Sequence, residues 1–108
     1  MSTTPEVSPL ELKAEIEGGA NLVLVDVREP HELEVSVLPG VVPIPLGELE
    51  ARFAEIPKDQ DVVLICRSGG RSGKATDFLI SQGYTKVRNM ATGMNGYATT
   101  ADLSLKTY

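Results

Sequence analysis

The sequence of 108 residues has one cysteine and one histidine. A single cysteine cannot form a disulfide within the chain, and one cysteine with one histidine cannot supply the clustered ligands of a zinc site. We therefore expect no metal. The formal net charge is −5, so the chain also lacks the basic surface on which nucleic-acid binding depends. No nucleic-acid partner is expected.

Long apolar runs are missing too. No stretch approaches the ~20 apolar residues that span a bilayer, and no basic start followed by an apolar run indicates a signal peptide. With 42% hydrophobic and 23% charged residues, the composition is typical of a soluble globular domain. We expect no membrane partner and a cytoplasmic location, where reducing conditions keep a cysteine as the thiol.

Short apolar runs alternate with helical patterns along the chain. The runs predict strands over residues 22–26, 41–45, 62–65 and 86–89, and the patterns predict helices over residues 8–17, 30–35, 46–56 and 72–81. This alternation predicts an α/β fold with a mostly parallel sheet and helices on both faces. Residues 1–7 are expected to be a polar N-terminal lead-in, and residues 8–108 to form one domain.

The single cysteine lies where a predicted strand meets a loop rich in glycine and arginine. The strand ends at Ile65, and the loop runs from Cys66 through Arg67, Ser68, Gly69, Gly70 and Arg71 to a helix that begins near Ser72. Two glycines let the loop curl so that its N–H groups point inward, and the helix start adds a positive dipole end. Such surroundings favour the thiolate, which is the nucleophilic form. A buried, inert cysteine is the alternative, but the boundary position favours a reactive one.

The remaining polar residues of the loop can serve an anion. Arg67 and Arg71 can each hold an oxyanion with a two-pronged guanidinium, or simply be solvated. Ser68 and Ser72 can donate hydrogen bonds, although Ser72 is alternatively only the N-cap of the helix. The loop ends in Gly-Arg-Ser rather than the Gly-Lys-Ser of a nucleotide site, so no nucleotide cofactor is expected. His31 is expected to be a surface residue at a helix start and not a general base.

Taken together, several segments resemble a single-domain rhodanese-like sulfurtransferase. They are residues 24–32 (Leu-Val-Asp-Val-Arg-Glu-Pro-His-Glu), Pro39-Gly40, residues 44–46 (Ile-Pro-Leu) and the loop from Cys66 to Ser72, in the same order as in the family. The resemblance covers residues 8–98 and implies a parallel sheet of about five strands.

The resemblance implies a thiosulfate sulfurtransferase without a cofactor. Cys66 would take a sulfane sulfur from thiosulfate or a persulfide donor, carry it as a persulfide and pass it to cyanide or a biological thiol. The loop amides from Arg67 to Ser72 would cradle that sulfur. Asp26 and Arg28 would support the loop through ion pairs. A faint likeness of residues 102–108 to the end of rhodanese domains fused to E1-like enzymes implies a sulfur-carrier protein or a cysteine desulfurase as partner.

Alternatives remain open at this point. Four residues separate Cys66 from Arg71, whereas related phosphatases and arsenate reductases have a longer loop, so a small phosphatase or arsenate reductase is less favoured. A non-catalytic binding or redox-sensing module is the other alternative, because a fold alone does not define an activity. The sequence also departs from the family at Ser36-Val37, where Gly-His is usual, and at Tyr97, where tryptophan is usual.

Overall fold

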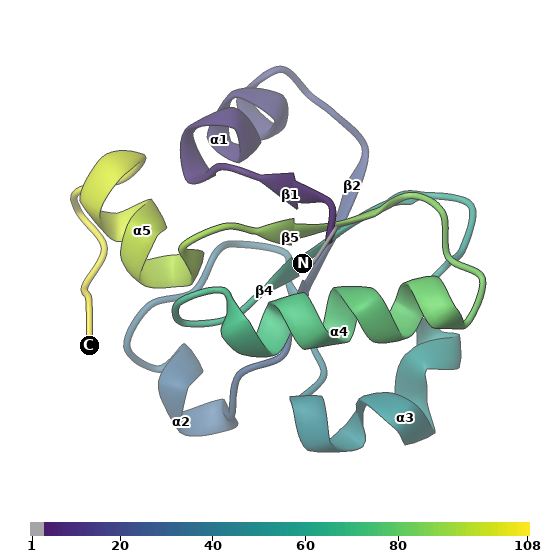
Figure 1. Cartoon of the computed structure of the whole chain (residues 1–108). Helices are drawn as coiled ribbons and strands as arrows, with labels where there is room; N and C mark the ends of the chain where they lie inside the picture. The colour runs from purple at the N-terminus through teal and green to yellow at the C-terminus, as the bar shows by residue number, and fades with distance from the viewer. Residues whose placement is uncertain (1–3) are drawn as a thin grey trace.

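The computed structural model describes residues 4–108 and is built around one parallel sheet (Figure 1). The strands lie in the order β1-β5-β4-β2-β3, and every neighbouring pair is parallel. Their bounds are β1 Glu6–Val7, β2 Leu22–Asp26, β3 Val42–Pro43, β4 Asp61–Ile65 and β5 Val87–Met90. The predicted α/β fold with a five-stranded parallel sheet is confirmed.

Helices cover both faces of this sheet (Figure 1). The helices α1 (Pro9–Glu17) and α5 (Gly93–Thr100) lie on one face, and α3 (Leu49–Arg52) and α4 (Gly70–Ser81) lie on the other. The short helix α2 (Pro30–Leu33) follows the carboxyl end of β2. Val62 and Leu64 of β4 pack into the core on the α4 side, whereas Val63 and Ile65 pack into the core on the α1 side. Burial on both faces explains why β4 is a continuous apolar run.

The first helix begins as its sequence predicts. The Ser8 hydroxyl accepts a hydrogen bond from the Glu11 amide at 3.1 Å, and the Glu11 carboxylate accepts one from the Ser8 amide at 3.0 Å. Pro9 occupies the first helical position, where its missing N–H costs nothing. This reciprocal pair satisfies two amides that the helix itself leaves without partners.

The structure differs from the expected elements at the sheet edges. Glu6 and Val7, expected in the lead-in, form the edge strand β1 beside β5, and Val7 is buried; residues 1–3 lie outside the described residues. A strand of two residues is too short to show a hydrophobic period, so no sequence pattern predicts it. At the other edge, the strand expected over residues 41–45 shrinks to Val42–Pro43, since each proline lacks an N–H for the ladder.

The helix expected over residues 46–56 is broken into three pieces. The short α3 is flanked by 3₁₀ turns, η1 (Leu46–Glu48) and η2 (Phe53–Glu55). Arg52 leaves helical geometry with φ −121° and ψ 0°. The bend brings Ile56 into the core on the α4 side of the sheet. Core packing thus overrides the helical period of this segment.

The order of the strands defines the functional edge. Strands β2 and β4 are neighbours, with Asp26 opposite Ile65. The chain leaves β2 towards β3 on one side and leaves β4 towards β5 on the other. In open α/β sheets, ligands bind where connections diverge in this way at the carboxyl ends of the strands. Among residues 4–108, none of the helices combines the length and the apolar character that a membrane span requires.

Candidate active site at the cysteine loop

Cys66 directly follows β4, at this diverging edge. The helix α4 begins at Gly70, two residues before the predicted start, and Gly69 is its N-cap with a left-handed φ of 103°. A Cβ on Gly69 would lie 3.3 Å from the Thr92 amide nitrogen. Gly70 already has helical geometry with open space around it, so only Gly69 needs to be glycine. The alternative role of Ser72 as N-cap is wrong, because Ser72 lies in the first turn of α4.

The cysteine thiol lies inside a ring of hydrogen-bond donors. Cys66 is 1% exposed, and its Sγ accepts hydrogen bonds from the Gly69 amide at 3.0 Å and from the Ser72 hydroxyl at 3.2 Å. Burial raises the pKa of the Cys66 thiol, but the Ser72 hydroxyl and the amides of Ser72, Gly69 and Ser68 outweigh it. The net pKa of Cys66 lies below its ordinary value, so the loop favours the thiolate.

The side chain of Asn89 on β5 makes hydrogen bonds with two of the residues that surround the thiol. Its Nδ2 donates to the Gly69 carbonyl at 3.0 Å, and its Oδ1 accepts from the Ser72 hydroxyl at 2.5 Å. Because the Gly69 carbonyl can only accept, the amide of Asn89 must be oriented this way round. The single proton of the Ser72 hydroxyl is therefore shared between Asn89 and the Cys66 sulfur. The sequence signal for Asn89 is a polar residue inside a buried strand, and Asn89 was not among the predicted site residues.

The guanidinium of Arg71 is already paired with a carboxylate, so it is not free to face an anion site. Its Nη1 and Nη2 donate to the two carboxylate oxygens of Glu32 at 2.7 and 2.8 Å. The Arg71 hydrogen bonds, opposed by burial, lower the pKa of Glu32 to about 2. Glu32 therefore carries its charge at neutral pH and balances that of Arg71. Glu32 was not among the site residues predicted from the sequence, although it follows the strand end that carries Asp26.

Asp26 and Arg28 form a buried ion pair, the kind of contact expected from the family. Both side chains are 0% exposed, and the Arg28 guanidinium donates to Asp26 at 2.8 and 2.9 Å. Arg28 also donates to the Ser36 carbonyl at 2.7 Å, and more weakly to the Glu32 carbonyl at 3.4 Å. Burial lowers the pKa of Arg28, but the hydrogen bonds with Asp26 and Tyr108 outweigh it and raise the pKa. The pair fixes the segment that presents Glu32 to Arg71.

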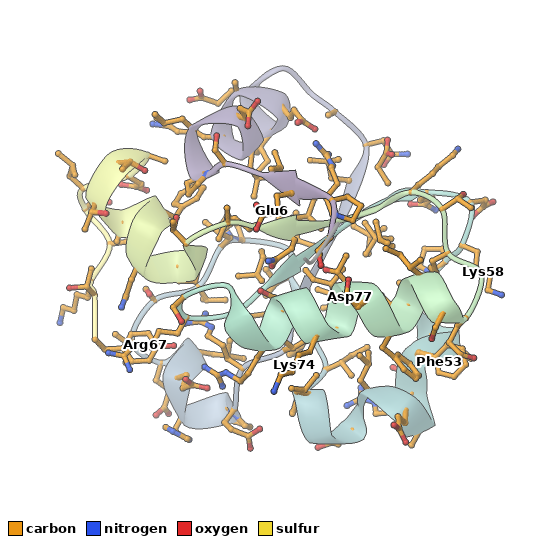
Figure 2. The ribbon with its side chains drawn as sticks, viewed as in Figure 1. Glu6, Phe53, Lys58, Arg67, Lys74 and Asp77 are labelled. Carbon is orange, nitrogen blue, oxygen red and sulfur yellow. The ribbon has the colours of Figure 1, made fainter. Side chains whose placement is uncertain are left out.

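Tyr108 joins these groups from the far end of the sequence. Its hydroxyl accepts from Arg28 at 3.1 Å and donates to Glu32 at 3.2 Å. Its ring lies beneath the guanidinium of Arg67, with the Arg67 carbon 4.9 Å from the ring centre. Figure 2 shows Arg67 near the end of the chain and at the opposite side of the molecule from Lys58. The faint family likeness of residues 102–108 did not predict this contact.

The first turn of α5 closes the other side of the loop. The amides of Met94 and Asn95 donate to the carbonyls of Cys66 and Arg67 at 2.8 and 3.0 Å. Gly93 makes this approach possible, because a Cβ there would lie 2.4 Å from the Arg67 carbonyl. Tyr97, which stands where the family usually has tryptophan, is buried in the core on the α1 side.

Two other predictions concern His31 and the presence of a metal site. His31 is exposed in the first turn of α2, and the described residues show no contact that would make it the base for Cys66. Within residues 4–108, no three histidine, cysteine, aspartate or glutamate side chains gather in a way that could hold a metal ion.

This geometry defines the class of protein. It is an α/β domain with a thiolate-stabilising loop at the carboxyl edge of a parallel sheet. Residues 8–100 match the family model described as the rhodanese-like domain. The chain therefore belongs to the rhodanese-like sulfurtransferase family.

Named relatives agree with this assignment. The chain is 37% identical over 93 residues to a protein named sulfurtransferase from Allochromatium vinosum, covering 86% of this chain and 87% of that one. It is 40% identical over 96 residues to the putative sulfur carrier protein YrkF of Bacillus subtilis, covering 89% of this chain but 52% of the relative. The chain thus spans about half of that second protein.

Solved structures show the same fold. The crystal structure of reduced Bacillus anthracis CoADR-RHD superposes with a TM-score of 0.84 at 35% identity, over 97% of this chain and 18% of that chain. A rhodanese-related protein from Thermoplasma volcanium gives a TM-score of 0.81 at 26% identity, over 90% of this chain and 93% of that chain.

Proposed function

We propose that the protein is a thiosulfate or persulfide sulfurtransferase that works through a persulfide on Cys66. The thiolate of Cys66 attacks the outer sulfur of thiosulfate, the sulfur–sulfur bond breaks, and sulfite leaves with the bonding electron pair. A thiophilic acceptor, either cyanide or a thiolate, then attacks the outer sulfur of the persulfide. The Cys66 thiolate leaves from that sulfur and returns to its starting state.

The environment of the Cys66 sulfur is the observation that carries this proposal. The amides and the Ser72 hydroxyl that lower the pKa of the thiol supply a nucleophile without a general base. Sulfur transfer needs a thiolate and a stabilised leaving anion, and it needs no proton transfer from a histidine. The donors that stabilise the thiolate are also placed to stabilise the terminal sulfur of a persulfide, which carries the same negative charge.

The buried sulfur also bears on the substrate class. Because Cys66 is 1% exposed, a donor must reach Sγ with a slender end, as the single outer sulfur of thiosulfate or of a persulfide does. A phosphate monoester presents a tetrahedral group to its nucleophile, and the short loop from Cys66 to Arg71 suits it less well. The loop amides from Arg67 to Ser72 are proposed as the sulfur cradle, with Asp26 and Arg28 as its supports.

Protein partners are proposed from the relatives' names. One relative is named putative sulfur carrier protein, and another, from Candida glabrata, is named adenylyltransferase and sulfurtransferase UBA4, with 36% identity over 101 residues that cover 83% of this chain and 23% of that protein. These names support a sulfur-carrier protein as acceptor. A cysteine desulfurase is the corresponding donor, because it holds sulfur as a persulfide that a thiolate can attack.

The decisive experiment measures the mass of the intact protein after treatment of the reduced form with thiosulfate and then with cyanide. We expect a gain of one sulfur atom, its removal by cyanide, and release of thiocyanate. Cys66→Ser should show none of these, and Lys58→Ala, which changes a residue far from the loop, should behave like the wild type. If neither thiosulfate nor a charged cysteine desulfurase transfers sulfur to Cys66, the protein is a binding or redox-sensing module instead.

A further inference from the structure

The two arginines of the loop differ in electrostatic state. Arg71 is neutralised by its two-pronged pair with Glu32. The Arg67 side chain makes no hydrogen bond or ion pair among the described residues, and it is exposed. Its charge therefore remains uncompensated, one residue away from the nucleophile. On a chain of net charge −5, this is a local positive charge on the residue that directly follows the nucleophile.

The contact with Tyr108 fixes where this charge lies. An exposed arginine samples many rotamers, and ordering it costs conformational free energy. The Tyr108 ring, 4.9 Å from the Arg67 guanidinium carbon, offers its negative face to the cation. The ring is itself held in place, because the Tyr108 hydroxyl bridges Arg28 and Glu32. The Tyr108 backbone also pairs with the Asn95 side chain at 3.1 and 3.2 Å.

We propose that Tyr108 is a positioning residue, and that it holds Arg67 as the cation that draws anionic reactants to the Cys66 sulfur. Arg67 is the group that guides the anion, and Tyr108 acts only through it. The inference rests on the proposed function in one respect: thiosulfate and persulfides, the donors proposed above, are anions. Arg71 takes a different part, since its charge serves the contact with Glu32.

The test compares two alkylating reagents that differ in charge. Iodoacetate is an anion and iodoacetamide is neutral, and both react with the thiolate of Cys66 by displacing iodide. The ratio of the two rate constants reports how strongly the site attracts a negative charge, and it cancels any change in the amount of thiolate. It requires no sulfur transfer. The rates are measured at low ionic strength, because salt screens an exposed charge within about 10 Å at 0.1 M.

Loss of the ring should lower this ratio. A cation–π contact at an exposed site is worth about 0.5–1 kcal/mol, which corresponds to about a two- to fivefold fall in the iodoacetate-to-iodoacetamide ratio for Tyr108→Leu. Tyr108→Phe keeps the ring and should keep most of the ratio. Arg67→Ala should lower the ratio at least as far as Tyr108→Leu, and the double variant should go no lower than Arg67→Ala alone.

A matched control separates a local effect from a change in net charge. Lys58 lies over the Tyr84 ring at 5.4 Å and on the opposite side of the molecule, so Lys58→Ala removes the same charge from an equivalent contact. Its ratio should equal that of the wild type. The melting temperature and the pH dependence of the iodoacetamide rate show whether each variant keeps its fold and its thiol pKa.

Three results would overturn the proposal. They are an unchanged ratio in Tyr108→Leu, a fall in Tyr108→Phe as large as in Tyr108→Leu, and a double variant that falls further than Arg67→Ala by the full factor of Tyr108→Leu. Failure here is distinct from failure of the proposed function. A protein that takes sulfur on Cys66 but shows no charge preference would refute only the roles of Arg67 and Tyr108. A charge preference without any persulfide would refute only the sulfur transfer.

Discussion

Replacing Ser72 by alanine should raise the pKa of the Cys66 thiol by about one unit. The Ser72 hydroxyl is the largest of the contributions that lower this pKa, and it lies 3.2 Å from Sγ. A hydrogen bond to a charged group contributes about 1.5–3 kcal/mol. The lower figure applies because the same proton is shared with Asn89, and 1.4 kcal/mol corresponds to about one pKa unit. The thiolate fraction below the pKa should then fall about tenfold.

The assay is the rate of iodoacetamide alkylation as a function of pH, whose midpoint gives the thiol pKa. Ser68→Ala is the matched control: Ser68 contributes to the thiol pKa through its backbone amide, which the substitution leaves in place. Its midpoint should not move. Ser72→Ala also leaves the Asn89 oxygen without its donor, so the melting temperature is measured in parallel. A midpoint in folded Ser72→Ala equal to the wild type's would refute the idea that the Ser72 hydroxyl lowers the thiol pKa.

Three further predictions concern stability, each measured by urea unfolding. Gly69→Ala should lower the free energy of unfolding by about 1–2 kcal/mol because the φ of Gly69 is 103°. Gly70→Ala, in helical geometry with open space, should leave the free energy of unfolding unchanged or raise it by up to about 1 kcal/mol. Equal losses in the two variants would contradict this. Glu32 has a folded pKa of about 2 against an ordinary 4.5, so its contribution is present above pH 4.5 and lost as the pH falls towards 2. Glu32→Gln should remove about 3 kcal/mol of this pH-dependent stability, because one pKa unit corresponds to about 1.4 kcal/mol. An unchanged dependence of the unfolding free energy on pH would count against the pairing. Arg28→Met should cost about 3–5 kcal/mol because it leaves a buried carboxylate without its counter-charge; a second change, Asp26→Leu, should restore part of this, and no restoration would refute the explanation.

The sequence predicted the central elements well because their signals are local. The apolar run of β4 and the start of the first helix near Ser8 depend only on neighbouring residues, and both have the expected structure. The lead-in prediction failed at Glu6 and Val7, because a two-residue strand is defined by its partner β5 and not by its own pattern. The broken helix over residues 46–56 failed for a related reason: the position of Ile56 in the core decides the backbone, and the helical period does not.

The candidate site also has a part that local sequence predicts and a part that depends on distant contacts. The loop from Cys66 to Ser72 is contiguous, and its composition predicts a thiolate-stabilising turn. Glu32, Asn89 and Tyr108 come from three distant segments and meet the loop only after the sheet has formed. Their roles in the site depend on hydrogen bonds to residues that are distant in the sequence, and motif spacing does not reveal such partners. That both arginines stabilise an anion stays a prediction, and the structure adds a partner that composition does not reveal: the guanidinium of Arg71 is paired with Glu32.

This division between amides and arginines has a consequence for salt dependence. Hydrogen bonds from the loop act at about 3 Å on a buried sulfur, where mobile ions cannot screen them. The charge of Arg67 is exposed to solvent and is screened. The thiol pKa of Cys66, measured with neutral iodoacetamide, should therefore stay nearly constant between low and high salt, while the preference for iodoacetate over iodoacetamide should fall. A thiol pKa that rises strongly with salt would mean that arginine charge, and not the loop's N–H and O–H groups, holds the thiolate.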